Sequence, residues 1–258
     1  MSYSEFIKEM KMDGRLIAIT RVHKEDAELT DTFGCIYRTL RKVLAGETFT
    51  FALDNCSCSG FDHNTGLRDD MPNTPGGFGV FLSYGSDQQW TPPGEKFKCD
   101  PETAEAMWGC LPKDVMTSSE EVFDALRFEP YREGLHPDIV VAFCNPDQLS
   151  AMIVLHGYDK PEYDRVIAST VSGCASMVRI PLNELKSDKP RAVITGTDLA
   201  ARKFVPEGEL AFAVTGPEFD KMLSVTEECF FHSPVWKPVR NRLRAEEHLE
   251  DAKFTRLA

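Results

Sequence analysis

The residues best suited to chemistry are two cysteines that stand one residue apart. Cys56 and Cys58 lie in LDNCSCSGFDHNTG, residues 53–66, a stretch rich in Asp, Asn, Ser and Gly. Thiolates bind soft metals, zinc and iron–sulfur clusters, and His63 is a nearby candidate nitrogen ligand. The spacing differs from the paired cysteines of zinc ribbons and from ferredoxin runs. The loop alone therefore leaves two interpretations, a metal site or two small side chains that fill the loop.

Other cysteines of the chain stand in contexts that are informative only together. Cys35 follows a glycine inside a predicted helix, and Cys174 lies among small residues where a helix is predicted to break. Cys144 ends a predicted buried strand, and ligands of open α/β sheets bind near such strand ends. Taken singly, each is more often a small buried hydrophobe than a ligand. A nucleophilic thiol paired with a histidine also stays open, because sequence does not tell which groups are neighbours.

Two polar turns follow predicted strands and are candidates for binding a small molecule. They are NPDQ at 145–148 and GTDLAAR at 196–202. The alternative is ordinary helix capping, by Asn145 in the first turn and by Thr197 or Asp198 in the second. The chain has no GxGxxG motif that opens a helix, and its glycine-rich TPGGFGVF has no P-loop lysine, so we do not expect a phosphate site.

The elements that must position these groups follow from hydrophobic periodicity, turn residues and capping signals. We predict strands at 15–22, 48–54, 138–144, 191–196 and 209–216, with a short one near 79–84. We predict helices at 2–12, 27–44, 101–111, 118–126, 149–157, 217–231 and 239–252, and two helical pieces over 162–186 that break near 172–174. The segment 59–99 reads mostly as ordered loop. A continuous apolar strand, a tight turn and a helix over 136–157 form half of a βαβ unit.

The order of these elements predicts an α/β (or α+β) domain with a mixed sheet flanked by helices. We expect one domain over 1–235 and a charged helix or tail over 236–258. Leu243 and Leu249 in that tail are candidates for contact with a second copy of the chain.

Composition narrows the class of protein. The chain has 258 residues and a net charge of −12, from 41 acidic and 29 basic residues. This balance disfavours nucleic acid and anionic membranes as partners, because both are bound through Lys and Arg. The sequence shows no signal peptide and no apolar run long enough to cross a membrane. We expect a soluble cytoplasmic protein whose eight cysteines are not a disulfide framework.

The order of the motifs resembles an uncharacterised family, domain of unknown function 169, common in archaea and anaerobic bacteria. The resemblance covers roughly residues 10 to 225. It is carried by GCIYRTLRKVLAGETFTFALDNCSCSGFDHNTGL, HPDIVVAFCNPDQLSAMI, SGCASMVRIPL and GTDLAARKFVPEGELAFAVTG. The positions that match family motifs are Cys35; Cys58 with Gly60 and Gly66–Leu67; Asn145, Pro146 and Gln148; Cys174; and Arg202.

The resemblance implies that Cys35, Cys58 and Cys174 share one thiolate site, although they lie far apart in sequence. In a family of anaerobes the expected occupant is an iron–sulfur cluster, of the 4Fe–4S type. A fourth family cysteine is replaced by Thr197, so either Cys56 is the fourth ligand, one iron is open to substrate, or the site has been lost. We expect Asn145, Gln148 and Arg202 to line a small-molecule site.

The resulting expectation is an iron–sulfur or thiolate-metal protein that acts in electron transfer or in handling a small substrate or cofactor. A homodimer or a redox protein partner would be compatible with that role. The alternatives are a binding module without redox chemistry, which would hold a polar molecule through Arg202, and an enzyme that uses the thiol of Cys56 or Cys58.

Overall fold

A mixed sheet of seven strands forms the centre of the protein, and its mixed character is the one that the sequence predicts. The computed structural model describes residues 1–31, 34–53, 55–58, 60–74, 76–85 and 94–243. The strands are β1 (Leu16–Val22), β2 (Phe49–Ala52), β3 (Ala125–Pro130), β4 (Ile139–Cys144), β5 (Val166–Ala168), β6 (Ala192–Thr195) and β7 (Leu210–Thr215). Their order is β2-β3-β1-β4-β7-β6-β5. All neighbours pair antiparallel except β5 and β6, which are parallel.

Strand β4 is the middle of the sheet and is buried along its whole length. Its side chains alternate between two cores, with Ile139, Val141 and Phe143 in one and Val140 and Ala142 in the other. This explains its continuous apolar sequence, because both faces of a central strand are covered. Each fully buried Val, Ile or Phe contributes roughly 1.5–3 kcal/mol through apolar burial.

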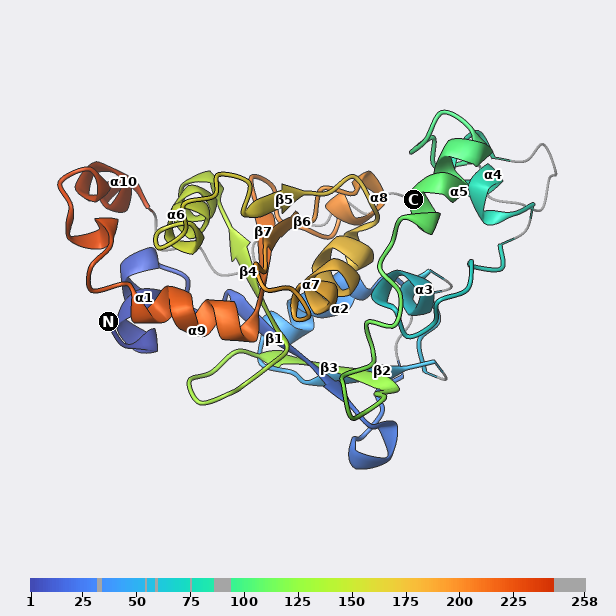
Figure 1. Ribbon diagram of the computed structural model, residues 1–258, viewed down its shortest axis with the longest axis horizontal. Coiled ribbons are helices and arrows are strands. Elements are labelled where there is room, and N and C mark those ends of the chain that lie inside the picture. Colours follow the sequence, from blue (N-terminus) through green and yellow to red (C-terminus); the bar gives the residue numbers. More distant parts are fainter. Residues whose placement is uncertain (32–33, 54, 59, 75, 86–93, 244–258) are drawn as a thin grey trace.

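The helices divide into two layers and a projecting pair. They are α1 (Tyr3–Met10), α2 (Ile36–Leu44), α3 (Phe61–Thr65), α4 (Phe78–Leu82), α5 (Pro101–Gly109), α6 (Pro146–His156), α7 (Ile180–Glu184), α8 (Leu199–Arg202), α9 (Gly216–Ser224) and α10 (Trp236–Arg242). Short helical turns are η1 (Lys24–Asp26), η2 (Ala175–Arg179) and η3 (Phe230–His232). Helices α1, α6, α9 and α10 pack on one face of the sheet, and α2, α3, η2, α7 and α8 on the other (Figure 1). Helices α4 and α5 form a third apolar cluster beside the second layer.

The predicted βαβ half-unit over 136–157 is present as β4 followed by α6. Asn145 caps α6, and its side chain accepts hydrogen bonds from the backbone of Asp147 and Gln148. The Gln148 side chain accepts the backbone N–H of Asn145 in return. From the pairings, β4 and β5 run in the same direction, so α6 connects two parallel strands that are separated by β7 and β6.

Three predicted elements were wrong in type or extent. The helix predicted over 27–44 begins at Ile36, because Gly34 has a φ of 86° just before it, a left-handed conformation that stops a helix. The predicted helix 118–126 is a turn followed by β3, where Ser118 caps amides of Glu120 and Glu121 without a helix continuing. The predicted strand near 79–84 is instead helix α4.

Two further segments differ toward the C-terminus. Within 162–186 the first predicted helical piece is absent and β5 stands in its place, while η2 and α7 form the second. The helix predicted over 217–231 ends at Ser224. Of the last predicted helix, 239–252, the structure places α10 up to Arg242, and residues 244–258, Leu249 among them, lie outside the described residues. Trp236 and Leu243 are buried in the core around α1.

In the parts of the chain that the structure describes, no helix is both long and apolar enough to cross a bilayer.

Candidate functional site

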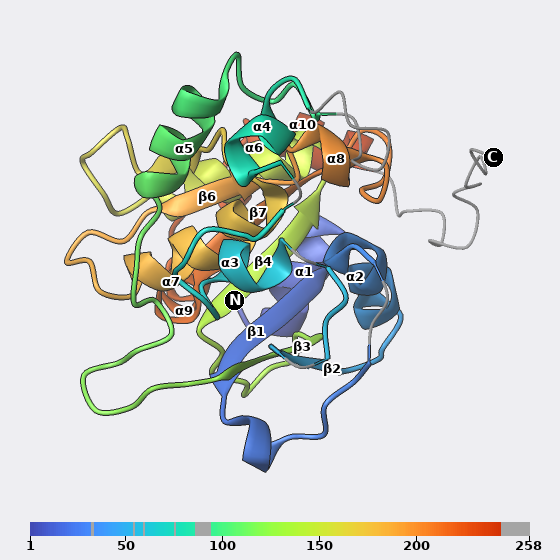
Figure 2. The ribbon, with the colours of Figure 1, turned by 90° about the vertical axis from the view of Figure 1, so that its right-hand side faces the viewer.

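A cavity of about 420 Å³ lies where the second helix layer meets the α4–α5 pair. This volume falls in the range of small-molecule sites. Figure 2 looks at the molecule from this side, with α3, α4, α5 and α8 toward the viewer. The cavity is lined by Cys35, Tyr37, Cys58, Gly60, Asn64, Pro72, Thr74, Phe78, Phe81, Leu82, Glu95, Phe97, Met107, Trp108, Leu111, Val171, Ser172, Cys174, Asp198, Ala200, Ala201, Lys203 and Phe204.

Cys35 occupies the N-cap position of α2 and is half-buried. The left-handed Gly34 before it turns the chain into the helix, and its backbone N–H donates to Ser57 Oγ at 2.8 Å. That hydrogen bond ties the start of α2 to the loop between Cys56 and Cys58. The first two predicted ligand segments are therefore fixed to each other directly.

The loop that carries Cys58 is shaped by Asn55. The Asn55 side chain accepts the backbone N–H of Ala52 at 2.7 Å and donates to the carbonyls of Thr30 and Thr50 at 2.9 and 2.8 Å. Cys58 then leads into α3 and lines the cavity. Cys56 packs against the same core and is half-buried, but it is not among the residues that line the cavity.

Cys174 enters the site from the turn before η2. Gly173 is required there, because a Cβ at this position would lie 2.8 Å from the ring of Tyr37. The Tyr37 hydroxyl is 3.1 Å from the carbonyl oxygen of Gly173, to which it donates, and 2.9 Å from Thr195 Oγ1. Asp198 Oδ2 accepts the backbone N–H of Gly173 at 3.0 Å. The position of Cys174 is therefore set by side chains of α2 and of the turn before α8.

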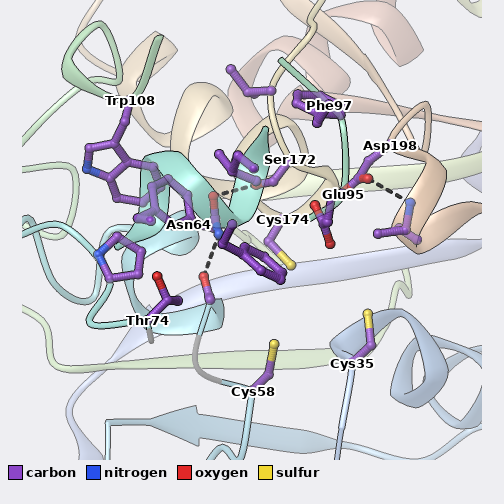
Figure 3. A pocket seen from close by; sticks show the side chains of 18 of the residues that line it. Cys35, Cys58, Asn64, Thr74, Glu95, Phe97, Trp108, Ser172, Cys174 and Asp198 are labelled. Atoms are coloured by element: carbon purple, nitrogen blue, oxygen red, sulfur yellow. Dashed lines mark hydrogen bonds between the residues drawn. The ribbon is translucent and has the colours of Figure 1, made fainter. Parts of the chain in front are cut away.

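A second polar contact holds the same turn against α3. Ser172 Oγ donates to Asn64 Oδ1 at 2.5 Å, and Asn64 Nδ2 donates to the carbonyl of Gly60 at 2.6 Å. Figure 3 shows this chain of hydrogen bonds at the cavity wall. It joins the segment that bears Cys174 to the segment that follows Cys58.

The three cysteines converge on the cavity. In Figure 3 the side chains of Cys35 and Cys58 point up into the cavity, and the side chain of Cys174 points down toward them. Burial raises the pKa of the Cys174 thiol well above its ordinary value, and the neighbouring Cys35 and Cys58 raise it further. Burial also raises the pKa of Cys35, with a contribution from Cys58. Cys35 and Cys58 thus lie near enough to Cys174 to disfavour its thiolate form, although no local sequence pattern connects the three.

The spacing of the side chains around the cavity limits which kinds of metal site they could form. Among the residues described by the structure, no three His, Cys, Asp or Glu side chains are close enough to hold a single ion. An iron–sulfur cluster binds each thiolate through a different iron atom, so its ligands lie farther apart than those of one ion. The three cavity thiols are therefore not placed as the ligands of one metal ion.

The predicted small-molecule residues lie elsewhere. Asn145 and Gln148 cap α6, and the fully buried Gln148 also donates to the carbonyls of Met10 and Lys11 at 3.1 Å each. Arg202 donates to the carbonyl of Glu209 at 2.6 Å. None of the three lines the cavity formed by the described residues. Their ligand-binding role stays a prediction, and the structure gives each of them a bond within the protein.

Two more residues considered as ligands have other partners. His63 is buried, and its Nδ1 lies 2.6 Å from the carbonyl oxygen of Asp70. Thr197, which stands where the family pattern has a cysteine, donates to the carbonyl of Ser169 at 3.4 Å. Neither residue is part of the cavity lining.

Sequence reasoning missed the aromatic wall of the cavity and its acidic rim. The wall comes from α4 and α5, and α4 was expected to be loop and strand. The density of aromatic residues in GGFGVFL was a usable signal of a buried segment. Asp198 was assigned only as a helix cap, and it does cap Ala200, at 2.9 Å, but its other oxygen also holds Gly173.

Comparison with known proteins shows the family. No curated protein and no solved structure matches the chain. The family described as uncharacterised ArCR, domain of unknown function 169, matches residues 5–225, which include all three cavity cysteines. That match spans most of the 258 residues and agrees with the resemblance carried by the cysteine and turn motifs. The chain therefore belongs to the ArCR family, domain of unknown function 169.

Proposed function

We propose that this protein is an iron–sulfur protein of an anaerobe, in which Cys35, Cys58 and Cys174 hold a 4Fe–4S cluster at the floor of the cavity. The observation that carries the proposal is the convergence of these three thiols, from three separate segments, on one cavity. Thiolates are the ligands that iron–sulfur clusters require. Buried cysteines placed by chance would more often be dispersed through the apolar core, as Cys144 and Cys229 are.

The cavity favours substrate or cofactor handling over electron transfer alone. Cys56, the fourth ligand expected from sequence, does not line the cavity, and its influence on the Cys174 thiol is the smallest of those resolved. With Cys35, Cys58 and Cys174 as its three protein ligands, one iron of such a cluster would have no thiolate. When bound, that iron supplies a Lewis acid or a site of electron transfer. Ligation by Cys56 remains the second arrangement, and a single variant separates the two.

The surrounding residues have positioning roles in this proposal. Asp198 and Tyr37 fix the backbone at Gly173, and Asn64 fixes Ser172, so that Cys174 is held in place. Aromatic side chains of α4 and α5 line the cavity and make that side of it apolar. Because burial raises the pKa of Cys35 and Cys174, these thiols hold their protons, and binding of iron to them would have to release those protons.

The test is purification and reconstitution without oxygen. We expect a brown protein with about four irons and a similar amount of acid-labile sulfide per chain. A broad absorption band that bleaches on reduction, and a paramagnetic signal of the reduced cluster, would identify the cluster type. A colourless chain that takes up no iron, with every thiol open to titration, would refute the proposal.

A second candidate is a binding module without metal, which the volume and aromatic lining of the cavity support. In that case the three thiols are small cavity-lining groups. Binding of a small molecule by protein that takes up no iron would favour this candidate. An enzyme that uses the thiol of Cys56 or Cys58 would instead show one thiol that is alkylated much faster than the others.

A further inference from the structure

The wall opposite the cysteines is made of aromatic rings. Phe78 and Phe81 come from α4, Trp108 from α5, and Phe97 from the segment between them. The rings of Phe78 and Trp108 meet edge to face with centroids 5.0 Å apart. Figure 3 shows Trp108 and Phe97 on the side of the cavity away from Cys35 and Cys58. Aromatic faces carry negative electrostatic potential and attract cations as well as apolar surfaces.

The charged side chains that line the cavity are mainly acidic. They are Glu95 and Asp198 against one base, Lys203. The Lys203 ammonium lies 5.2 Å from the centroid of the Phe204 ring, at the α8 side of the cavity. The cavity lining in the described residues contains no arginine, the side chain that would favour a carboxylate or phosphate group. Formal charges thus leave the lining net negative before any thiolate is counted.

The surroundings of the Glu95 carboxylate also favour a cation in the cavity. Glu95 lies at the exposed rim, with its backbone N–H donated to the carbonyl of Phe81 at 2.8 Å. Although the residue as a whole is exposed, partial burial beside the cavity raises the pKa of its carboxyl, Asp198 raises it further, and Lys203 lowers it. A positive charge brought into the cavity would relieve that repulsion.

We infer that the cavity binds a small organic cation, in which an ammonium or amidinium group is attached to an apolar group about the size of an aromatic ring. The charged group would lie beside Glu95, and the apolar group would pack against Phe81, Phe97 and Trp108. As the substrate class of the cluster site, this inference rests on the proposed function. Binding itself requires only the cavity and needs no iron. The volume of about 420 Å³ suits a ligand of one or two rings.

The experiment compares three probes that share one ring: benzyltrimethylammonium, benzyl alcohol and phenylacetate. Each is titrated by calorimetry into the intact chain before and after anaerobic iron reconstitution. We expect benzyltrimethylammonium to bind about tenfold more tightly than phenylacetate, because cation–aromatic and carboxylate attraction add for the cation alone. Benzyl alcohol should lie between them.

Two variants test whether Glu95 is a source of the preference for the cation. Glu95→Gln removes the rim charge and should lower the cation-to-anion ratio several-fold, while the aromatic rings and Asp198 retain part of the preference. Glu102→Gln removes the same charge from the exposed part of α5, outside the cavity lining, and should keep the ratio. Equal or tighter binding of phenylacetate, no binding of any probe, or an unchanged ratio in Glu95→Gln would overturn the inference.

The outcomes separate the two proposals. Cation preference in a chain that never takes up iron would sustain the inference and remove the cluster. Iron loading without cation preference would sustain the cluster and remove the proposed substrate class.

Discussion

The two faces of the sheet are built differently. On the face covered by α1, α6 and α9, here called the packed face, Gln148 is fully enclosed between α6 and the end of α1, where it donates to two backbone carbonyls. On the other face, three half-buried cysteines stand at the ends of turns, and hydrogen bonds between distant segments hold those turns in place. Both faces carry a large apolar core, and the second, here called the cavity face, also places three thiols around a cavity.

The cysteines themselves provide the largest expected contrast between the faces. Serine in place of Cys35, Cys58 or Cys174 should each reduce iron content after anaerobic reconstitution by about tenfold or more, because a hydroxyl is a poor substitute for a thiolate on iron. The measurement is iron per chain on folded protein.

Cys144→Ser and Cys110→Ser are the matched controls. Cys144 is buried on the packed face, and Cys110 is exposed after α5. Both variants should keep the iron, and Cys144→Ser should cost stability because its hydroxyl enters an apolar core. Equal iron loss in all variants would show that the two faces do not differ in this respect.

The next largest effect is expected on stability at Arg179, whose guanidinium bonds to three segments on the cavity face. It is 1 % exposed, and its Nε donates to the carbonyl of Pro112 at 2.6 Å and its Nη2 to Asp69 at 2.5 Å, while Nη1 donates to the carbonyl of His63. Arg179→Leu should lower the free energy of unfolding by about 3 kcal/mol, because several buried acceptors lose their donor. Chemical denaturation measures it.

Lys189→Leu is the control for Arg179, because Lys189 is an exposed base paired with Glu162 at the surface. It should change stability by less than about 1 kcal/mol. A similar small cost for Arg179→Leu would mean that the loops of the cavity face do not depend on this guanidinium.

The packed face should respond to acid through His156. Burial lowers its pKa to about 4, with Lys160 adding to the effect and Glu218 opposing it. The folded protein favours the neutral imidazole of His156, whereas the unfolded chain protonates it near the ordinary pKa of 6.5. The contribution of His156 to stability is therefore fully present above pH 6.5 and is lost as the pH falls from 6.5 toward 4. At pH 5 the loss should be about 2 kcal/mol relative to pH 7.

Urea unfolding at pH 7 and pH 5 tests this, with His156→Leu as the comparison. The variant should lose this part of the pH dependence and keep the contributions of other groups. An identical pH dependence in both proteins would contradict the assignment to His156.

A smaller effect is expected at Gly173, where a methyl group would collide with Tyr37. Gly173→Ala should cost about 1–2 kcal/mol by overpacking. It should also reduce iron content, because the turn carries Cys174. Gly109→Ala, at an α5 position where a Cβ has no neighbour within 4 Å, should leave iron unchanged. Full iron content in Gly173→Ala would show that this turn tolerates displacement.

Cys56→Ser should have the smallest effect on iron. If three thiols hold the cluster, the variant keeps most of its iron, and only the spectrum of the cluster can shift. If Cys56→Ser loses as much iron as Cys58→Ser, Cys56 is instead the fourth ligand, which is one of the arrangements predicted from the sequence.

The difference between the faces also explains how far the sequence could predict the structure. The β4–α6 unit has a continuous apolar strand, an Asn–Pro turn and a capping box, so local signals specified it correctly. The mixed sheet followed from the same kind of signal. Where the period of apolar residues was ambiguous, as in the segment that became α4, tertiary packing against α5 decided the structure.

The candidate site was predicted only through the family motifs. Nothing local to Cys35, Cys58 or Cys174 indicates that they meet, because the contacts that join them, such as Gly34 to Ser57 and Asp198 to Gly173, bridge distant segments. The family motifs at Asn145, Gln148 and Arg202 drew attention to strand ends where these side chains bond within the protein. The aromatic wall was invisible to motif reasoning, because its residues become a site only by packing together.

One measurement tests the central claim most directly. Each cysteine is alkylated with iodoacetamide, before and after anaerobic iron loading, and its labelling is quantified by peptide mass spectrometry. The account predicts that loading protects Cys35, Cys58 and Cys174 together, while the exposed Cys99 and Cys110 stay reactive. Protection of none of the three, or of only one of them, would contradict a shared cluster.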